Sequence, residues 1–161
     1  MDADSTPQWL RNYAAKEFPV TFNPVEAPGF AGLLDDWPIG PDQFSLVNCP
    51  FKDSQLWIEK AAKESQRGAM SLVFVPAMFN SVYFRESVYP HAREIIIFTC
   101  PIKLPGKNKQ LVAQTSLLVF AARDEDAQND KFPFITLAEP EGWQEEYYKR
   151  ERNRSRFAST K

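Results

Sequence analysis

Residues 44–75 read FSLVNCPFKDSQLWIEKAAKESQRGAMSLVFV and contain the pattern that decides the fold. The apolar runs Phe44–Val47 and Met70–Val75 have the length and composition of buried strands. Between them, Ser54–Gln66 carries apolar side chains at helical spacing, and Gly68 follows the end of this segment. Parallel strands need a crossover connection, which is usually a helix. This stretch therefore predicts a strand, a helix and a second strand that runs parallel to the first.

The same alternation continues on both sides of this unit. Thr6 and Pro7 are residue types that favour a helix start, as N-cap and first helical residue. A loop-rich stretch then reaches Gln43, and loops of that length are often functional. The other expected elements are helices over residues 6–18 and about 81–88, and strands over residues 19–22, 94–99 and 115–120. This order predicts an α/β fold with a mostly parallel sheet flanked by helices.

Length and composition exclude several classes of protein. The chain has 161 residues, which suits one globular domain. Its apolar runs are too short to span a bilayer and its N-terminus is acidic, so we expect no membrane partner and an intracellular location. Cys49, Cys100 and His91 are too few for a Cys/His metal centre or a disulfide framework, so no metal site is expected.

Charge is segregated along the chain. The formal net charge is only −2, yet Lys103, Lys107 and Lys109 cluster in one expected loop and residues 149–156 form a basic tail. Clustered basic residues are a typical contact for phosphate, although a solvated, frayed helix is an equally good interpretation of the tail. We expect one main domain over residues 1–122 and a charged, partly helical C-terminal extension over residues 123–161.

Two polar loops follow expected strands. Asn23 and Asn48 each come directly after a strand, and ligands of parallel sheets collect at the carboxyl ends of the strands. The Asn48 side chain and the carbonyl of Cys49 can accept hydrogen bonds from an exocyclic amine. Pro50 stiffens the turn and Phe51 can stack on a ring. The tetrapeptide thus suggests a pocket for a planar amine, although Asn-x-Pro at a strand end is also an ordinary turn.

Further residues extend this pattern over residues 6–120. In chain order they are Thr6-Pro7, Asn23-Pro24 with Ala27, Asn48 to Phe51, Trp57 with Lys60-Ala61, Val75-Pro76-Ala77, Tyr83-Phe84 and Leu118-Val119-Phe120. The tetrapeptide resembles the Asn/Asp-Pro-Pro-Tyr/Phe signature of amino-methyltransferases that use S-adenosylmethionine. The whole series resembles the phage-type DNA N6-adenine methyltransferase (Dam-like) family.

This resemblance implies a Rossmann-like S-adenosylmethionine-dependent methyltransferase fold and methylation of the N6 amine of adenine in DNA. Asn48 and the Cys49 carbonyl would bind the amine, Pro50 would stiffen the turn, and Phe51 would stack on the base. The base would have to be extruded, because N6 is otherwise engaged in the duplex. The protein would then be cytoplasmic or associated with DNA, with Lys103, Lys107 and Lys109 as the nucleic-acid contacts.

The resemblance also implies a cofactor site, and this site departs from the family pattern. Its expected members are Thr6, Pro7, Asn23, Pro24, Glu26 and Ala27. Asn23 stands where the family has an acidic residue, unless Glu26 supplies the carboxylate. Cys49 replaces the first proline of the signature. Residues 99–103 read TCPIK where the family has Gly-Arg-x-x-Phe, which removes an arginine expected to contact phosphate.

Two functions follow from these observations. In the first, the chain is an active adenine-N6 methyltransferase, in which amine acceptors and cofactor proximity supply the catalysis. In the second, the chain keeps the fold without catalysis and serves as a binding or structural subunit of a larger assembly with protein partners. The altered positions 23, 49 and 99–103 suit the second function.

Overall fold

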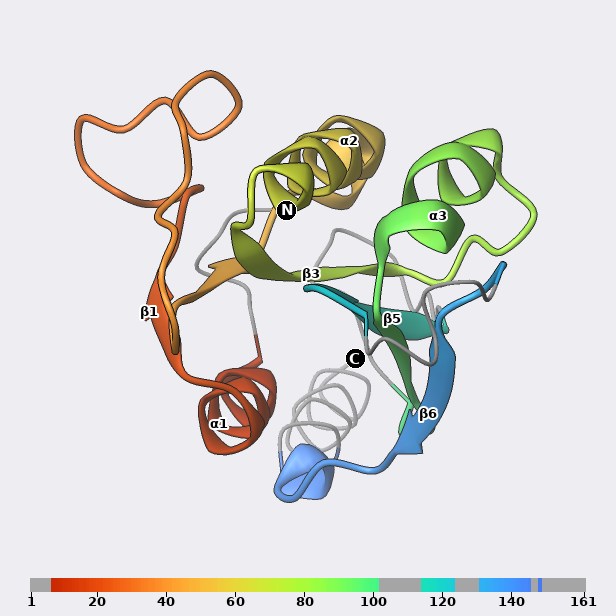
Figure 1. Ribbon diagram of the computed structural model, residues 1–161. Coiled ribbons are helices and arrows are strands. Elements are labelled where there is room, and N and C mark those ends of the chain that lie inside the picture. The colour runs from red at the N-terminus through yellow and green to blue at the C-terminus, as the bar shows by residue number, and fades with distance from the viewer. Residues whose placement is uncertain (1–6, 102–113, 124–130, 146–147, 149–161) are drawn as a thin grey trace, which may run out of the picture.

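The computed structural model describes residues 7–101, 114–123, 131–145 and 148. Within these residues, a six-stranded sheet has the order β1-β2-β3-β5-β4-β6, and helices lie on both of its faces (Figure 1). The strands are β1 (Val20–Phe22), β2 (Phe44–Val47), β3 (Met70–Pro76), β4 (Glu94–Phe98), β5 (Thr115–Phe120) and β6 (Phe134–Ala138). The helical segments are α1 (Gln8–Glu17), η2 (Phe51–Asp53), α2 (Ser54–Gln66), η3 (Phe84–Val88) and α3 (Tyr89–His91).

The strand directions confirm the expected α/β, Rossmann-like fold with a mostly parallel sheet. β1 pairs in parallel with β2, and β2 with β3. β4 and β6 are also parallel to each other. β5 lies between β3 and β4 and is antiparallel to both, so it alone of the described strands runs in the opposite direction. The amino end of β5 therefore lies at the edge where the other strands end.

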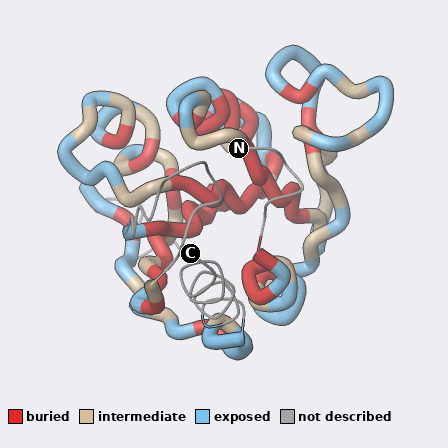
Figure 2. The backbone as a smooth tube through the Cα atoms, turned by 180° about the vertical axis from the view of Figure 1, so that it is seen from behind, coloured by how far each residue is buried: buried red, intermediate tan, exposed pale blue. Residues whose placement is uncertain are grey.

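The core has two layers, one on each face of the sheet. On one face, α2 and the η3-α3 segment cover a cluster that includes Ile58, Val73 and Leu118. On the other face, α1 covers a cluster that includes Phe74 and Phe98. The sheet curves around α1 (Figure 1), and its central strands are buried along their length (Figure 2).

α2 has the bounds that its apolar period predicts, Ser54–Gln66. Gly68 follows with φ of 101°, a left-handed conformation that glycine adopts without a steric penalty. The N–H of Ala69 donates to the carbonyl of Glu64 at 3.0 Å, which completes the cap and turns the chain directly into β3. The short connection keeps the helix packed on the sheet beside β3.

The helix expected over residues 81–88 contains a π-helical turn. In η3 the N–H of Tyr89 donates to the carbonyl of Phe84, five residues back. Pro90, which has no N–H, comes next, and helical structure continues through α3 to His91. The π turn accommodates Pro90, which would otherwise interrupt an α-helix because it has no N–H to donate.

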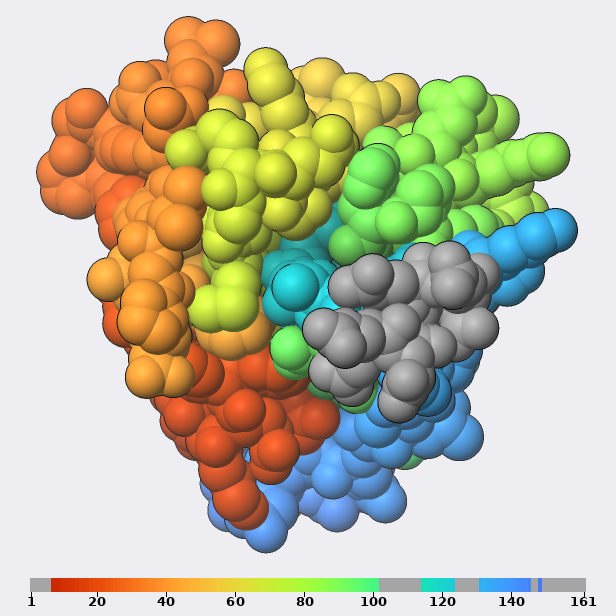
Figure 3. Space-filling view, viewed as in Figure 1, coloured from red at the N-terminus to blue at the C-terminus, as the bar shows by residue number. Residues whose placement is uncertain are grey.

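β6 lies beyond residue 122, where we expected a charged extension. It pairs with β4 through five residue pairs and forms one edge of the same sheet. In the space-filling view, the blue side chains of β6 and of the segment after it form the lower right margin of the molecule (Figure 3). The sheet thus continues past the expected boundary, because a short apolar strand lies between two charged stretches of sequence.

A buried carboxylate fixes the long loop between β1 and β2. Glu64 of α2 is 1% exposed and accepts hydrogen bonds from the Lys60 ammonium at 2.6 Å and from the Trp37 backbone N–H at 3.1 Å. The Arg67 guanidinium donates to the same carboxylate at 2.5 Å and to the Trp37 carbonyl at 3.0 Å. The loop is thereby attached, at Trp37, to the C-terminal turn of α2.

Trp37 and Gly32 extend this attachment toward β1. The indole N–H of Trp37 donates to the Gly32 carbonyl at 2.7 Å. A Cβ atom on Gly32 would lie 2.2 Å from the Pro24 carbonyl oxygen and 2.7 Å from the Trp57 ring. Only glycine fits between these groups, so the loop segment that follows β1 is packed directly against α2.

We predict that Glu64→Gln will lower the free energy of unfolding by about 3 kcal/mol, because it leaves the buried Lys60 without its counterion. Burial raises the pKa of Glu64, but the hydrogen bonds from Lys60, Arg67 and Trp37 outweigh it and hold the pKa below its ordinary value of 4.5. A lowered pKa stabilises the fold above pH 4.5, and this stabilisation disappears as the pH falls through the folded-state pKa.

Urea unfolding at pH 7 and at pH 4 measures both effects. Glu59→Gln, on the exposed side of the same helix, is the control and should change stability little. If the two variants were equally stable at pH 7, the carboxylate would not hold the loop.

Candidate functional site

The carboxyl edge of the sheet brings the predicted loops together. β1 and β2 are parallel neighbours, so Asn23 after β1 and Asn48 after β2 lie at the same edge. α1 runs antiparallel to these strands, since Trp9 contacts Phe98 at the end of β4 and Phe18 contacts Phe44 at the start of β2, with ring centroids 5.2 Å apart in both pairs. Pro7, at the N-terminus of α1, therefore lies toward the same edge.

The tetrapeptide forms a compact turn. Asn48 is only 2% exposed, which places the candidate amine acceptor inside the fold rather than on an open loop. Pro50 has φ of −56° and ψ of 134°, and Phe51 begins η2. The Ser54 hydroxyl donates to the Phe51 carbonyl at 2.6 Å. The Phe51 ring is half-buried and packs against Phe74 with centroids 5.6 Å apart, so only its outer part is open to a second ring.

Cys49 is a packing residue. Its side chain is 1% exposed and belongs to the cluster under α2. Burial raises the pKa of the Cys49 thiol to about 12, and a smaller repulsion from Asp53 acts in the same direction. The thiol is therefore protonated at neutral pH and unsuited to nucleophilic attack. Any chemical role of Cys49 falls to its backbone carbonyl.

Asn23 shapes the loop after β1. Its side-chain oxygen accepts hydrogen bonds from the N–H groups of Val25 at 2.9 Å and Glu26 at 3.3 Å. Its amide nitrogen donates to the Glu26 carboxylate at 3.1 Å, and its backbone carbonyl accepts from the Ala27 N–H at 3.0 Å. Pro24 is buried beneath this turn. The turn thus presents an exposed Glu26 carboxylate beside Asn23, at the end of β1.

Sequence patterns did not identify two residues at this edge, Gln114 and Thr115. They lie here because β5 is antiparallel. The Gln114 carbonyl accepts from the Ala77 N–H at 2.8 Å, and its side-chain amide donates to the Phe98 carbonyl at 2.8 Å. The Thr115 hydroxyl is buried and has no hydrogen-bond partner among the described residues. Their position at this edge could have been predicted only by recognising that β5 is antiparallel to its neighbours.

Thr6, Lys103, Lys107 and Lys109 lie outside the described residues, so their assigned contacts to cofactor and DNA stay predictions. In the part of the chain that the structure describes, no group of three or more His, Cys, Asp or Glu side chains is arranged to hold a metal ion. A search of the same residues found no helix both long and apolar enough to cross a membrane.

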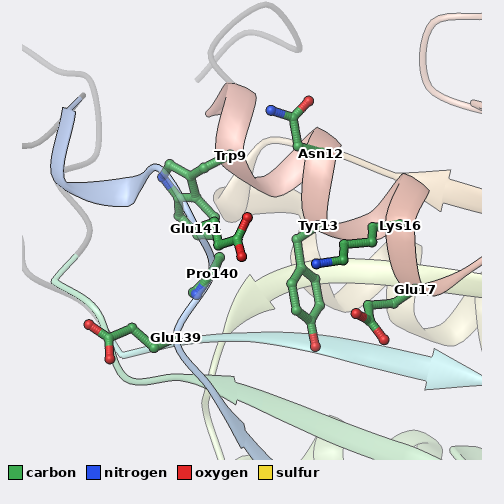
Figure 4. A pocket seen from close by; sticks show the side chains of 8 residues that line it. All are labelled: Trp9, Asn12, Tyr13, Lys16, Glu17, Glu139, Pro140 and Glu141. Carbon is green, nitrogen blue, oxygen red and sulfur yellow. The ribbon is translucent and has the colours of Figure 1, made fainter.

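A separate cleft of about 210 Å³ lies between α1 and the segment after β6 (Figure 4). Residues of α1 form one side, and residues 139–141 form the other. The lining residues are Trp9, Asn12, Tyr13, Lys16, Glu17, Glu139, Pro140 and Glu141. This cleft includes none of the residues predicted for the cofactor or the amine.

Comparisons with known proteins give one distant likeness. No family model matches the chain, and no curated protein matches it. Among solved structures, a Listeria monocytogenes protein assigned to the class I S-adenosylmethionine-dependent methyltransferases aligns with 66% of this chain and 39% of its own, at 19% identity and a TM-score of 0.42. At this level the likeness is too remote to carry an argument about function.

We predict that Cys49 and Cys100 in the folded protein react with a thiol reagent at pH 8 roughly 100-fold more slowly than an exposed cysteine. Burial raises the pKa of Cys49 to about 12 and that of Cys100 to about 11, so little thiolate is present. Labelling followed by mass spectrometry measures both rates, with Val82→Cys as the exposed reference. Fast labelling of Cys49 in the native protein would show that the tetrapeptide is open to solvent.

Proposed function

We propose that this chain is an S-adenosylmethionine-dependent methyltransferase that acts on the N6 amine of adenine in DNA. One observation carries the proposal: the parallel pairing of β1 and β2 puts the Asn23–Ala27 turn and the Asn48–Phe51 turn at one edge of the sheet. A transfer reaction needs a donor site and an acceptor site side by side. Adjacent strand ends meet that requirement.

The turn after β1 has suitable chemistry for the cofactor. S-adenosylmethionine carries ribose hydroxyls and an amino group, which a carboxylate recognises by accepting hydrogen bonds. Glu26 provides this carboxylate beside Asn23, where the family has an acidic residue. Pro7 at the start of α1 would be a second contact from the same side. When bound, the cofactor supplies an electrophilic methyl group.

The tetrapeptide would hold and activate the amine. The Asn48 side-chain oxygen and the Cys49 carbonyl would accept the two N–H groups of N6, which orients its lone pair toward the methyl donor. Positive charge would develop on this nitrogen as it took the methyl group and the sulfonium left as a neutral thioether. Fixed acceptor dipoles in a buried site would stabilise that charge until one N–H proton was lost to solvent. Phe51 would stack on the extruded base with the outer part of its ring. Lys103, Lys107 and Lys109 would contact the DNA phosphates.

The first test is cofactor binding. At ten times its Kd, S-adenosylmethionine should stabilise the protein by about 1.4 kcal/mol and raise Tm by mass action. Glu26→Gln should weaken the affinity roughly tenfold or more, since it removes a charged acceptor. Isothermal calorimetry measures this affinity, with Glu59→Gln as a matched control on the exposed side of α2. Absence of binding to the wild-type protein at millimolar cofactor would contradict the proposal.

The second test addresses the amine site. Asn48→Ala should reduce methyl transfer to adenine-containing DNA by roughly 100-fold or more, because it removes one preorganised acceptor. Cofactor affinity should change little. Ser45→Ala, at another buried polar residue of β2, should keep its activity and controls for damage to the strand. Transfer of labelled methyl groups from the cofactor measures the effect, with each variant assayed below its own Tm.

The non-catalytic subunit stays a second candidate, and a specific observation favours it. Asn48 is almost completely buried, and the Asn23 side chain is engaged within its own turn. If wild-type protein binds the cofactor but transfers no methyl group to any adenine-containing DNA, the second candidate is correct. If Cys49→Pro, which restores the family signature, then gains transfer, Cys49 is the residue at which catalysis was lost.

A further inference from the structure

The free edge of β6 has the properties of an interaction surface. β6 pairs with β4 on one side, and no strand of the described residues pairs with its other side. Phe134, Ile135 and Leu137 are exposed, and residues 132–138 include no charged side chain. Exposed edge strands are normally protected from pairing by charges, bulges or a covering segment. Within β6, this edge has no such charge.

The backbone of β6 presents a defined set of hydrogen-bonding groups. The N–H of Phe134 donates to the Arg93 carbonyl at 3.1 Å, and the carbonyl of Ala138 accepts from the Thr99 N–H at 2.9 Å. In a parallel ladder, alternate residues bond to the same neighbour. Residues 134, 136 and 138 therefore face β4. Ile135 and Leu137 direct their N–H and C=O groups to the free edge, where they offer two donors and two acceptors.

We propose that β6 pairs antiparallel with the β6 of a second copy of this chain, around a two-fold axis at Thr136. In this register Ile135 lies opposite Leu137 of the second copy, and Leu137 lies opposite its Ile135. Each pair exchanges two N–H···O=C bonds, as hydrogen-bonded antiparallel pairs do. The N–H and C=O groups of Ile135 and Leu137 are thus self-complementary, which a two-fold interface requires. The two sheets then form one continuous sheet.

The side chains agree with this register. Ile135 and Leu137 of both copies meet on one face of the joined sheet and cover each other's apolar surface. On the other face, the large Phe134 ring lies opposite the small Ala138 of the second copy. No like charges meet across the paired strands, because residues 132–138 are uncharged.

Sedimentation velocity of the full chain tests the proposal. We expect a dimer that dissociates on dilution, whereas a monomer throughout the range up to about 100 μM would overturn the proposal, since a specific interface of this kind should be populated there. Leu137→Lys should raise the dimer Kd roughly tenfold or more by placing a charge on the edge. Val82→Lys is the matched control, since Val82 and Leu137 are both 68% exposed. Equal Kd values for the two variants would place the interface elsewhere.

Leu137→Pro tests the backbone bonds directly. It removes only an N–H that points to the free edge, and edge strands tolerate proline there. We expect circular dichroism to show that the variant is folded and sedimentation velocity to show that it is a monomer. If this variant does not fold, Thr136→Cys decides the register. In the proposed register, Thr136 lies opposite Thr136 of the second copy in a non-hydrogen-bonded pair. The two Cα atoms of such a pair are about 4.5 Å apart, which is within the range of a disulfide.

Mild oxidation should crosslink Thr136→Cys and leave Ile135→Cys monomeric under denaturing conditions. Residue 135 lies opposite residue 137 in the proposed register, so its cysteines do not meet. Crosslinking of Ile135→Cys in preference to Thr136→Cys would overturn the register.

Discussion

The carboxylate of Glu64 connects parts of the chain that would otherwise be independent. It receives the Lys60 ammonium, the Arg67 guanidinium and the Trp37 backbone N–H, and thereby attaches the loop after β1 to α2. Because Gly32 lies between Pro24 and Trp57, this attachment extends to the Asn23–Ala27 turn. α2 itself begins directly after the tetrapeptide and η2. The two turns of the candidate site are therefore held by one helix. The cost of burying the Glu64 charge is compensated by its three donor residues. Their hydrogen bonds also offset the entropy that is lost when the loop after β1 is ordered.

Much of this fold could be predicted from local pattern alone. The period of apolar residues and the glycine at position 68 gave α2 its bounds, and the parallel order of β1, β2 and β3 follows from the connections between them. Composition does not give the direction of β5, because a strand buried on both faces has the same composition whether it runs parallel or antiparallel. The available signal was the lack of an expected helix between residues 99 and 115, since parallel strands need a crossover connection. β6 was missed for a different reason. Four of its five residues are apolar, but charged residues on both sides favoured an extension outside the sheet.

The candidate site was predictable in its location and not in its detail. Two asparagines after parallel strands had to lie at the same edge, and they do. The burial of Asn48 and Cys49 depends on η2 and α2 folding over the strand end, which is a tertiary effect. Gln114 and Thr115 reach this edge only because β5 is reversed. Local pattern thus identified the residues contributed by parallel strands and missed those contributed by the antiparallel strand.

The burial of Asn48 sets a condition on any substrate that reaches it. Two short-range hydrogen bonds close the turn: the Asp53 N–H donates to the Pro50 carbonyl at 2.9 Å, and the Ser54 hydroxyl donates to the Phe51 carbonyl. Cys49 and Phe51 in addition pack against the core. None of the hydrogen bonds that Glu64 accepts comes from these residues. A rearrangement that exposes Asn48 therefore has to displace the Cys49 side chain and the Phe51 ring from the core. Cys49 lacks the fixed φ of the proline found at that place in the signature that the tetrapeptide resembles, and it has a backbone N–H that proline does not have. The substitution keeps the carbonyl acceptor and makes the turn that carries it less rigid, so its effect should fall on the positioning of a bound amine rather than on the groups that contact it.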